Sequence, residues 1–245
     1  MAFEILIIVA FSSFIQSIFG VGVLLLGTPL LILLGYNFFQ ALVVLLPISL
    51  LINIFQIIKY YSAIDVEFYK KILIYTVPFI VIFLIFINKT NINIGIVIGI
   101  LLLLVASKDL STKANRIVNL LLQYEKSYLI LMGILHGLTN LGGPLLTAIV
   151  HAKNYEKQIT RATIAASYAT FATFQLTTLF FTGFEINIKF SLFALYMVVG
   201  LVVFISTEKF VYAYIDAKAY QKYFAIFIFL TGLLISKPVK NNVVN

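Results

Sequence analysis

The sequence predicts an all-α, polytopic membrane protein with about eight hydrophobic helical segments. Two features of its composition lead to this fold class: 62% of the 245 residues are hydrophobic and only 11% are charged, whereas a soluble domain is nearer half apolar and a quarter charged. The third observation is that 54 consecutive residues between Glu4 and Lys59 carry no charge. A soluble enzyme and a nucleic-acid-binding module are therefore excluded, and the formal charge of +8 is assigned to membrane-flanking basic residues.

The first half of the chain is predicted to contain one broken and three plain helices. The charge-free run after Glu4 would form a helix of roughly 80 Å, but a bilayer core is about 30 Å thick, so the run must turn inside or at the membrane. We expect helix-breaking residues at Gly27 and Pro29, together with Gly20 and Gly22. The predicted segments are residues 3–34, 38–59, 71–88 and 92–107. Membrane strands would alternate polar and apolar residues, which these segments do not.

The second half is predicted to have the same order. A polar linker, residues 108–126, leads into a segment interrupted by Gly137, Gly142, Gly143 and Pro144. The predicted segments are residues 127–150, 159–182, 188–206 and 220–236, followed by a polar tail, residues 237–245. The chain thus divides into a first transmembrane repeat over residues 1–107 and a second over residues 127–236.

The two halves align as an internal repeat with an offset of about 120 residues. Gln16 falls on His136 and Gly22 on Gly142, and a Phe-Gln pair ending at Gln56 has a counterpart ending at Gln175. Short Gly/Pro-interrupted segments at corresponding positions in two halves indicate the binding site of a transporter. The alternative is that the glycines only allow close helix packing in the membrane.

The basic residues favour one of two topologies. If each broken segment crosses the membrane once, Lys and Arg divide almost evenly between the two sides. If each is a hairpin that returns to the side it entered, thirteen of the seventeen basic residues share one side. The positive-inside rule favours the hairpins, which would make the second repeat inverted relative to the first and place the linker in the cytoplasm.

The two glycine-rich stretches resemble a known family. The first reads from Phe11 to Gly22, followed by Gly27-Thr28-Pro29, and the second reads from Gly133 to Pro144. They are similar to the paired signatures of the sulfite exporter TauE/SafE family, also called the TSUP family of anion permeases. This sequence has Val23 where the family usually has another Gly, and Asn140 where the leading Gly is expected. The resemblance implies transport of sulfite, organosulfonates or related sulfur-containing or carboxylate anions.

The candidate site is built from neutral groups. A half-helix N-terminus carries a partial positive charge and open N–H donors, so it binds anions, and no Lys or Arg lies deep in an apolar run. We therefore expect no full positive charge at the site. The predicted substrate-binding residues are Gln16, Ser17, Gly20, Gly22, Gln56, His136, Thr139, Asn140, Gly142, Gly143 and Gln175.

His136 is the one ionisable side chain expected deep in a broken segment. Such a group is a functional hypothesis by default, and proton coupling of anion transport is one interpretation. The other is a neutral histidine hydrogen-bonded to its neighbours. The chain has two His and no Cys, so we expect no metal site and no cofactor.

These features favour a secondary transporter of small anions in the cell membrane. An intramembrane enzyme would need paired acid–base or metal groups, which the apolar runs lack. A membrane scaffold without transport activity stays open, as does a homo-oligomer. The expected partners are a small anionic substrate and the lipid bilayer.

Overall fold

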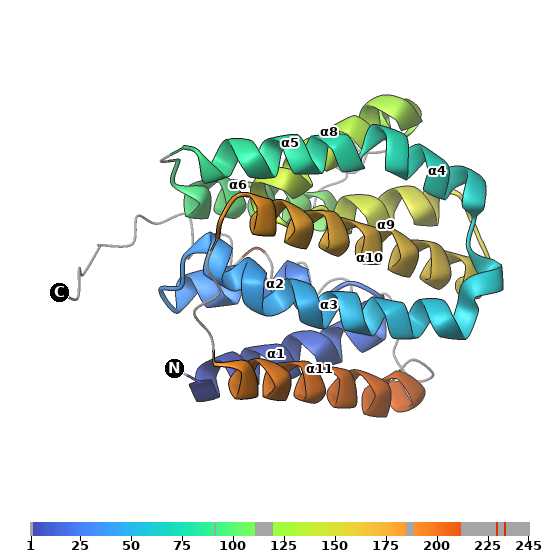
Figure 1. The fold of residues 1–245 in the computed structure, drawn as a ribbon. Helices are drawn as coiled ribbons and strands as arrows, with labels where there is room; N and C mark the ends of the chain where they lie inside the picture. The colour runs from blue at the N-terminus through green and yellow to red at the C-terminus, as the bar shows by residue number, and fades with distance from the viewer. Residues whose placement is uncertain are drawn as a thin grey trace.

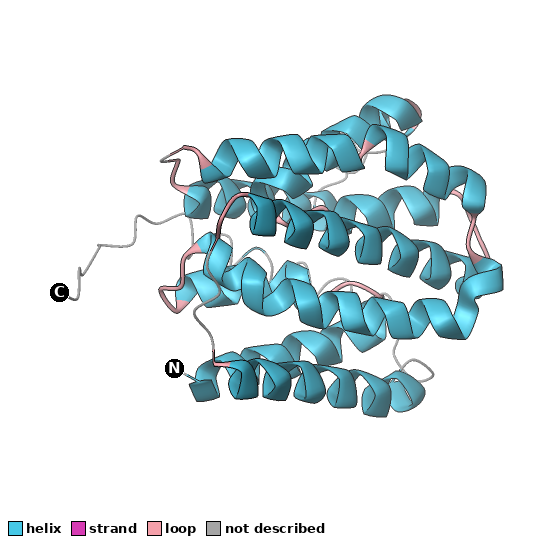
Figure 2. Ribbon diagram, viewed as in Figure 1, coloured by secondary structure: helices cyan, strands magenta, loops and turns pink. Residues whose placement is uncertain are grey.

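The computed structural model describes residues 2–90, 92–110, 120–184 and 189–211, together with Phe229 and Leu233. Within these residues the secondary structure is helical (Figure 2), with ten α-helices and one 3-10 helix. The all-helical fold class is therefore confirmed. Four helical stretches are long and apolar enough to cross a membrane: Phe38–Ala63, Val66–Asn88, Lys157–Phe181 and Phe190–Glu208. Shorter apolar helices accompany them.

The first predicted segment is broken into two helices, as expected. Helix α1 (Ala2–Phe19) and helix α2 (Val23–Leu33) are separated by Gly20-Val21-Gly22. Helix α3 (Phe38–Tyr60) follows and begins with a capping box, in which Asn37 and Gln40 each accept the other's backbone N–H. A 3-10 turn, η1 (Tyr61–Ala63), ends this stretch.

The third predicted segment starts earlier than expected and is kinked. Helix α4 (Val66–Tyr75) begins at residue 66 because Asp65 accepts the Phe68 N–H as an N-cap. Helix α5 (Val77–Asn88) follows after Thr76. Pro78, in the first turn of α5, has no N–H to donate to the preceding turn, which explains the kink.

Helix α6 (Ile94–Leu110) completes the first half and runs beyond the predicted end at residue 107. In the second half, the linker ends and the broken segment begins at α8 (Glu125–Thr139), which is followed by α9 (Gly143–Ala152), α10 (Lys157–Phe181) and α11 (Phe190–Val211). Residues 111–119 of the linker, the predicted tail, and the segment over residues 220–236 apart from Phe229 and Leu233 lie outside the described residues.

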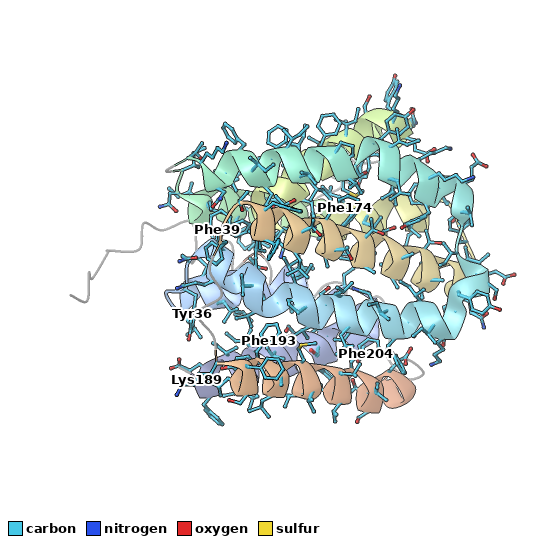
Figure 3. All side chains as sticks on the ribbon, viewed as in Figure 1. Tyr36, Phe39, Phe174, Lys189, Phe193 and Phe204 are labelled. Carbon is cyan, nitrogen blue, oxygen red and sulfur yellow. The ribbon has the colours of Figure 1, made fainter. Side chains whose placement is uncertain are left out.

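Each broken segment folds back to the side from which it started (Figure 1). Helix α1 leads away from the end of the molecule marked N, and α2 returns to that end, where α3 begins. Tyr36, between α2 and α3, lies at this end together with Lys189 (Figure 3). Helices α8 and α9 form a second hairpin, and its two ends meet in an ion pair between Glu125 and Lys153 at 3.2 Å. Both broken segments are therefore hairpins.

Helices from the two halves alternate through the thickness of the molecule. Helices α3 and α10 pack along each other at the centre, α11 packs on α1, and α5 packs on α8. Figure 1 shows these pairs as successive layers, with α5 and α8 at one face and α1 and α11 at the other. The first helix of each broken segment thus packs on a helix from the opposite half.

Candidate functional site

Both hairpins turn at a residue in the left-handed backbone region. Gly20 has a φ of 72° and Asn140 has a φ of 61°. Glycine adopts this conformation without penalty, and asparagine tolerates it better than most residues. The N–H of each still donates to the carbonyl four residues earlier, Gln16 at 2.9 Å and His136 at 2.7 Å. Asn140 therefore performs the backbone role that a glycine performs in the first break.

The first break is capped by an amide side chain from the helix before it. Gln16 Oε1 accepts the N–H of Val23, the first residue of α2, over 2.9 Å. Gly22 makes this geometry possible, because a methyl group there would lie 2.6 Å from the Ser12 carbonyl oxygen. A freed N–H inside a bilayer must find a partner, and Gln16 supplies one.

Gln16 also connects the first break to helix α3. Its Nε2 donates to Asn53 Oδ1 at 3.4 Å, and Gln56 Nε2 donates to the same oxygen at 3.4 Å. Asn53 in turn donates to the Ser49 carbonyl at 2.8 Å. These side chains are all buried, so the predicted residues Gln16 and Gln56 lie in one hydrogen-bonded group, which Asn53 holds together.

The second break is capped by an imidazole. The N–H of Gly142 donates to His136 Nδ1 over 3.0 Å, so that nitrogen carries no proton and the proton of the neutral ring is on Nε2. His136 Nε2 then donates to Gln175 Oε1 over 3.2 Å. His136 is fully buried and packs against Phe171 of α10. The structure is thus that of a neutral, hydrogen-bonded histidine.

This bonding direction leaves a buried donor without a partner. Because His136 occupies the oxygen of Gln175, the orientation of that amide is determined. Its Nε2 is buried and has no hydrogen-bond partner among the described residues, and the same is true of Asn140 Oδ1. Buried polar groups are nearly always paired, so each exception requires an explanation.

The two breaks lie against each other. Asn140 Nδ2, at the end of α8, donates to Thr28 Oγ1 of α2 over 3.1 Å. A methyl group on Gly143 would lie 3.7 Å from the side chain of Val21 and would clash with the Tyr168 hydroxyl. The absence of a side chain at Gly143 therefore allows Val21 of the first break and Tyr168 of α10 to approach the start of α9.

Two other predicted site residues make local contacts. The Thr139 hydroxyl donates to the Leu135 carbonyl at 2.6 Å and accepts the Leu141 N–H at 3.2 Å, which stabilises the turn. Ser17 Oγ donates to the Phe14 carbonyl and accepts a hydrogen bond from Thr207 of α11. The Ser17 hydroxyl is therefore engaged with α11.

Three predicted helix-breaking residues need correction. Gly27 and Pro29 lie inside the continuous helix α2, and Gly137 lies inside α8. Gly27 and Gly137 are packing positions, because a methyl group there would lie 2.8 Å from Leu45 and 2.7 Å from the Ile80 carbonyl oxygen, respectively. Pro144 is in the first turn of α9, where proline is well tolerated.

A full positive charge also lies nearer the first break than expected. Arg161, at the start of α10, reaches across to donate from Nη2 to the Ser17 carbonyl at 3.3 Å. Its side chain is 11% exposed and also pairs with Glu208 of α11 at 3.2 Å. The prediction of no full positive charge at the site did not include this contact, because residue position within an apolar run does not show how far an arginine side chain reaches.

The arrangement offers several donors to a small anion. In α2 and α9, the first N–H groups that donate to the preceding turn are those of Leu26 and Leu146. Their acceptors are the carbonyls of Gly22 and Gly142, respectively. The earlier N–H groups of Leu24, Leu25 and Gly143 have no acceptor within their helices. Together with Gln175 Nε2, they form a set of donors at two helix N-termini that lie against each other.

A model of the sulfite exporter TauE/SafE family matches residues 5–235 of the chain. This range includes both breaks, most of α1 and all of the other described helices from α2 to α11. No curated protein and no solved structure matched the chain.

Proposed function

The chain belongs to the sulfite exporter TauE/SafE family, whose members are membrane transporters and not enzymes, and from this premise we propose that it is a secondary transporter of small anions. Sulfite, organosulfonates and related sulfur-containing or carboxylate anions are the substrates that we propose. The observation that carries the proposal is the buried amide nitrogen of Gln175. It has no hydrogen-bond partner among the described residues and belongs to the same hydrogen-bonded group as the second break.

An anion at the breaks would satisfy groups that are otherwise unpaired. Gln175 Nε2 and the open N–H groups of α2 and α9 are donors, and the helix dipoles favour negative charge at the same place. The proposed substrate-binding set is that of the sequence, centred on Gln16, Gly22, His136, Asn140 and Gln175. Binding by neutral donors is weak enough for release, which turnover requires.

We also propose that the two halves are inverted repeats. In support, α11 packs on α1 as α5 packs on α8, and the members of each corresponding pair run in opposite directions (Figure 1). Gln16 and His136, which align at an offset of 120 residues, each accept an N–H beside the start of the following helix, from Val23 and from Gly142, respectively. A two-fold axis between the breaks would let one rearrangement open the site to either side.

The linker is proposed to be cytoplasmic and the protein to reside in the cell membrane. With two hairpins, the ends of α3, α6 and α9 and the start of α10 share one side (Figure 1), which carries most of the basic residues. Lys113→Cys, in a chain without native cysteines, should resist an impermeant thiol reagent added outside cells. Efficient labelling from outside would reverse the orientation.

Flux in proteoliposomes tests the function directly. Purified protein should move radiolabelled sulfite or a small organosulfonate across the bilayer faster than protein-free vesicles do. Gln175→Leu removes the unpaired donor and replaces it with an apolar side chain of similar size. This variant should lose the flux while remaining folded. If none of a panel of sulfur and carboxylate anions moves, the proposal fails and a scaffold role gains support.

A further inference from the structure

A carboxylate is held between two cations next to the first break. Glu208 of α11 places Oε1 3.2 Å from Arg161 Nη2 of α10, and Oε2 3.3 Å from Lys59 Nζ of α3. Three helices that are distant in sequence thus converge on one carboxylate. The anion transport proposed above does not use this group.

The position of this group distinguishes it from an ordinary surface ion pair. The Glu208 side chain is 5% exposed and that of Arg161 is 11% exposed, while Lys59 is 41% exposed and leads to the surface. A second carboxylate, Glu125, is also held by two cations, Lys71 at 3.5 Å and Lys153 at 3.2 Å, but it is 32% exposed. Buried charges in a membrane protein are costly and are a functional hypothesis by default.

The charged group is connected directly to the first hairpin. Arg161 Nη2 donates to the Ser17 carbonyl over 3.3 Å, and Thr207, the neighbour of Glu208, donates to Ser17 Oγ over 2.7 Å. Ser17 is three residues before the left-handed turn at Gly20. The group of Lys59, Glu208 and Arg161 therefore extends from the partly exposed Lys59 to the turn between α1 and α2.

We propose that Lys59 and Arg161 form a second binding site for a small oxyanion, in which the Glu208 carboxylate is a resident ligand that the free anion displaces. A carboxylate, a sulfonate and sulfite all present oxygens around a small central atom. Two cations that bind a carboxylate can therefore also bind a sulfonate or sulfite. The identity of the free anion rests on the proposed transport function. The site itself rests on the geometry of the three side chains.

Displacement of Glu208 by an incoming anion would make this a transient binding site on the way to the breaks. Two cations attract the anion from the basic side of the protein, while the tethered Glu208 competes for them and prevents tight trapping. An anion that leaves is replaced by the carboxylate, so Lys59 and the largely buried Arg161 always keep a counter-ion. Both properties favour passage over retention.

Chemical rescue tests this site without any flux measurement. Glu208→Ala should lower the melting temperature of the purified protein, because it leaves two cations without their carboxylate. Acetate should restore about 3 °C or more at constant ionic strength, since a ligand that binds only the folded state stabilises it. Gluconate, which is too bulky for the vacated space, should not do so.

Matched variants make the result specific. Glu125→Ala removes the exposed carboxylate that also has two cationic partners, and it should show no preference for acetate over gluconate. Adding Arg161→Gln to Glu208→Ala should abolish the preference. If Glu208→Ala does not fold, Glu208→Ser, whose short side chain also vacates the space of the carboxylate, should show the same preference. Equal effects of acetate and gluconate on both Glu208 variants would overturn the proposal.

The flux assay separates this proposal from the proposed function. Glu208→Gln should lower KM for anion uptake from the linker side about threefold or more, because the competing charge is gone, whereas Glu125→Gln should leave KM unchanged. Acetate rescue without flux of any anion by the wild type would contradict the transport function and support the site. Flux without rescue would do the reverse.

Discussion

The two breaks share a backbone plan but differ in the side chain that caps them. Each helix ends at a left-handed residue, Gly20 or Asn140, and a side chain from its last turn accepts an N–H at the start of the next helix, from Val23 in α2 and from Gly142 just before α9. In the first break that side chain is an amide, Gln16, and in the second it is an imidazole, His136. An amide does not titrate, whereas an imidazole can take up a proton near neutral pH.

This difference assigns separate roles to the two breaks. A proton on His136 Nδ1 would have to replace the hydrogen bond from Gly142, because a protonated nitrogen cannot accept one. Protonation would therefore release an N–H donor at the start of α9 and add a positive charge beside it, and both changes favour an anion. The first break has no such alternative state, so its cap is fixed. We propose that any proton coupling acts through the second break alone.

The largest effect is expected from adding a methyl group inside the breaks. Gly22→Ala would place it 2.6 Å from the Ser12 carbonyl oxygen, which belongs to the α1 backbone and cannot turn away. We expect a loss of about 3 kcal/mol of stability or more, measured as a lower melting temperature.

The corresponding change in the second break should also be costly. Gly142→Ala would place a methyl group 2.7 Å from both Cβ and Nδ1 of His136, and because the Cβ is attached to the α8 backbone, a turn of the ring relieves only part of the clash. Gly35→Ala is the control, because Gly35 has a φ of 91° but no neighbouring atom within 4 Å of the added group, so it adds only backbone strain of about 1 to 2 kcal/mol. Gly22 has an extended φ of −175° and no left-handed strain, so a loss for Gly22→Ala no larger than that for Gly35→Ala would contradict the steric argument.

The next effect concerns the contact between the breaks. Asn140→Leu removes the amide that bonds to Thr28 and fills the space beside it, so flux should be abolished. The left-handed backbone adds about 1 to 2 kcal/mol of strain for leucine, but we expect the protein to remain folded. Asn140→Gly keeps the backbone conformation and removes only the amide. Wild-type flux in Asn140→Gly would exclude this amide from the site.

Replacing His136 with glutamine gives the second break the same kind of cap as the first. We expect a smaller effect on the transport rate but a loss of its pH dependence. His136→Gln can still accept the Gly142 N–H and cannot titrate. Flux should therefore persist within about tenfold of the wild type, a cost of one neutral hydrogen bond, and should lose its pH dependence. Wild-type flux at every pH would mean that His136 is structural.

The smallest effect is expected away from both breaks. Asp65, before α4, accepts hydrogen bonds from the Phe68 amide and the Tyr155 hydroxyl. Burial alone would raise the pKa of Asp65, but these bonds outweigh it and lower the pKa. The ionised carboxylate therefore stabilises the fold at neutral pH and loses this contribution as the pH falls below about 4.

Tyr155→Phe removes one of these bonds and should cost about 1 kcal/mol at pH 7. The cost should shrink at pH 3, where Asp65 is increasingly protonated. Melting curves at the two pH values measure this, and flux at neutral pH should match the wild type. A large loss of flux in Tyr155→Phe would mean that the two breaks depend on packing around Asp65. The difference between the breaks could then not be assigned to their caps alone.

The breaks were predictable from the sequence because their signals are local. Glycines and a polar side chain within seven residues specify the cap from Gln16 to Val23, and the same holds for His136 and Gly142. Gly27 and Gly137 were misassigned because a glycine that breaks a helix and one that packs against a neighbour look alike in sequence. Only the positions of Leu45 and the Ile80 carbonyl oxygen distinguish them.

Contacts between distant segments account for what the sequence did not predict. Helix length and charge placed Arg161 near a membrane boundary, but its bonds to Ser17 and Glu208 join positions 144 and 47 residues away. The link between Gln175 and His136 likewise needs α10 to lie beside α8. The Thr76 hydroxyl, at the kink between α4 and α5, donates to the Leu129 carbonyl of α8 at 3.0 Å, a contact that the sequence does not predict.

The shortness of α2 and α9 has a consequence for how the chain enters the membrane during synthesis. These helices have 11 and 10 residues, so each is roughly 15 Å long, about half of a bilayer core. Neither can be released into lipid alone, because an end at mid-depth would expose unpaired backbone groups to hydrocarbon. Each must therefore insert together with the helix before it. Because Asn140 binds Thr28 across the two hairpins, the first hairpin reaches its final environment only after the ribosome has delivered the second.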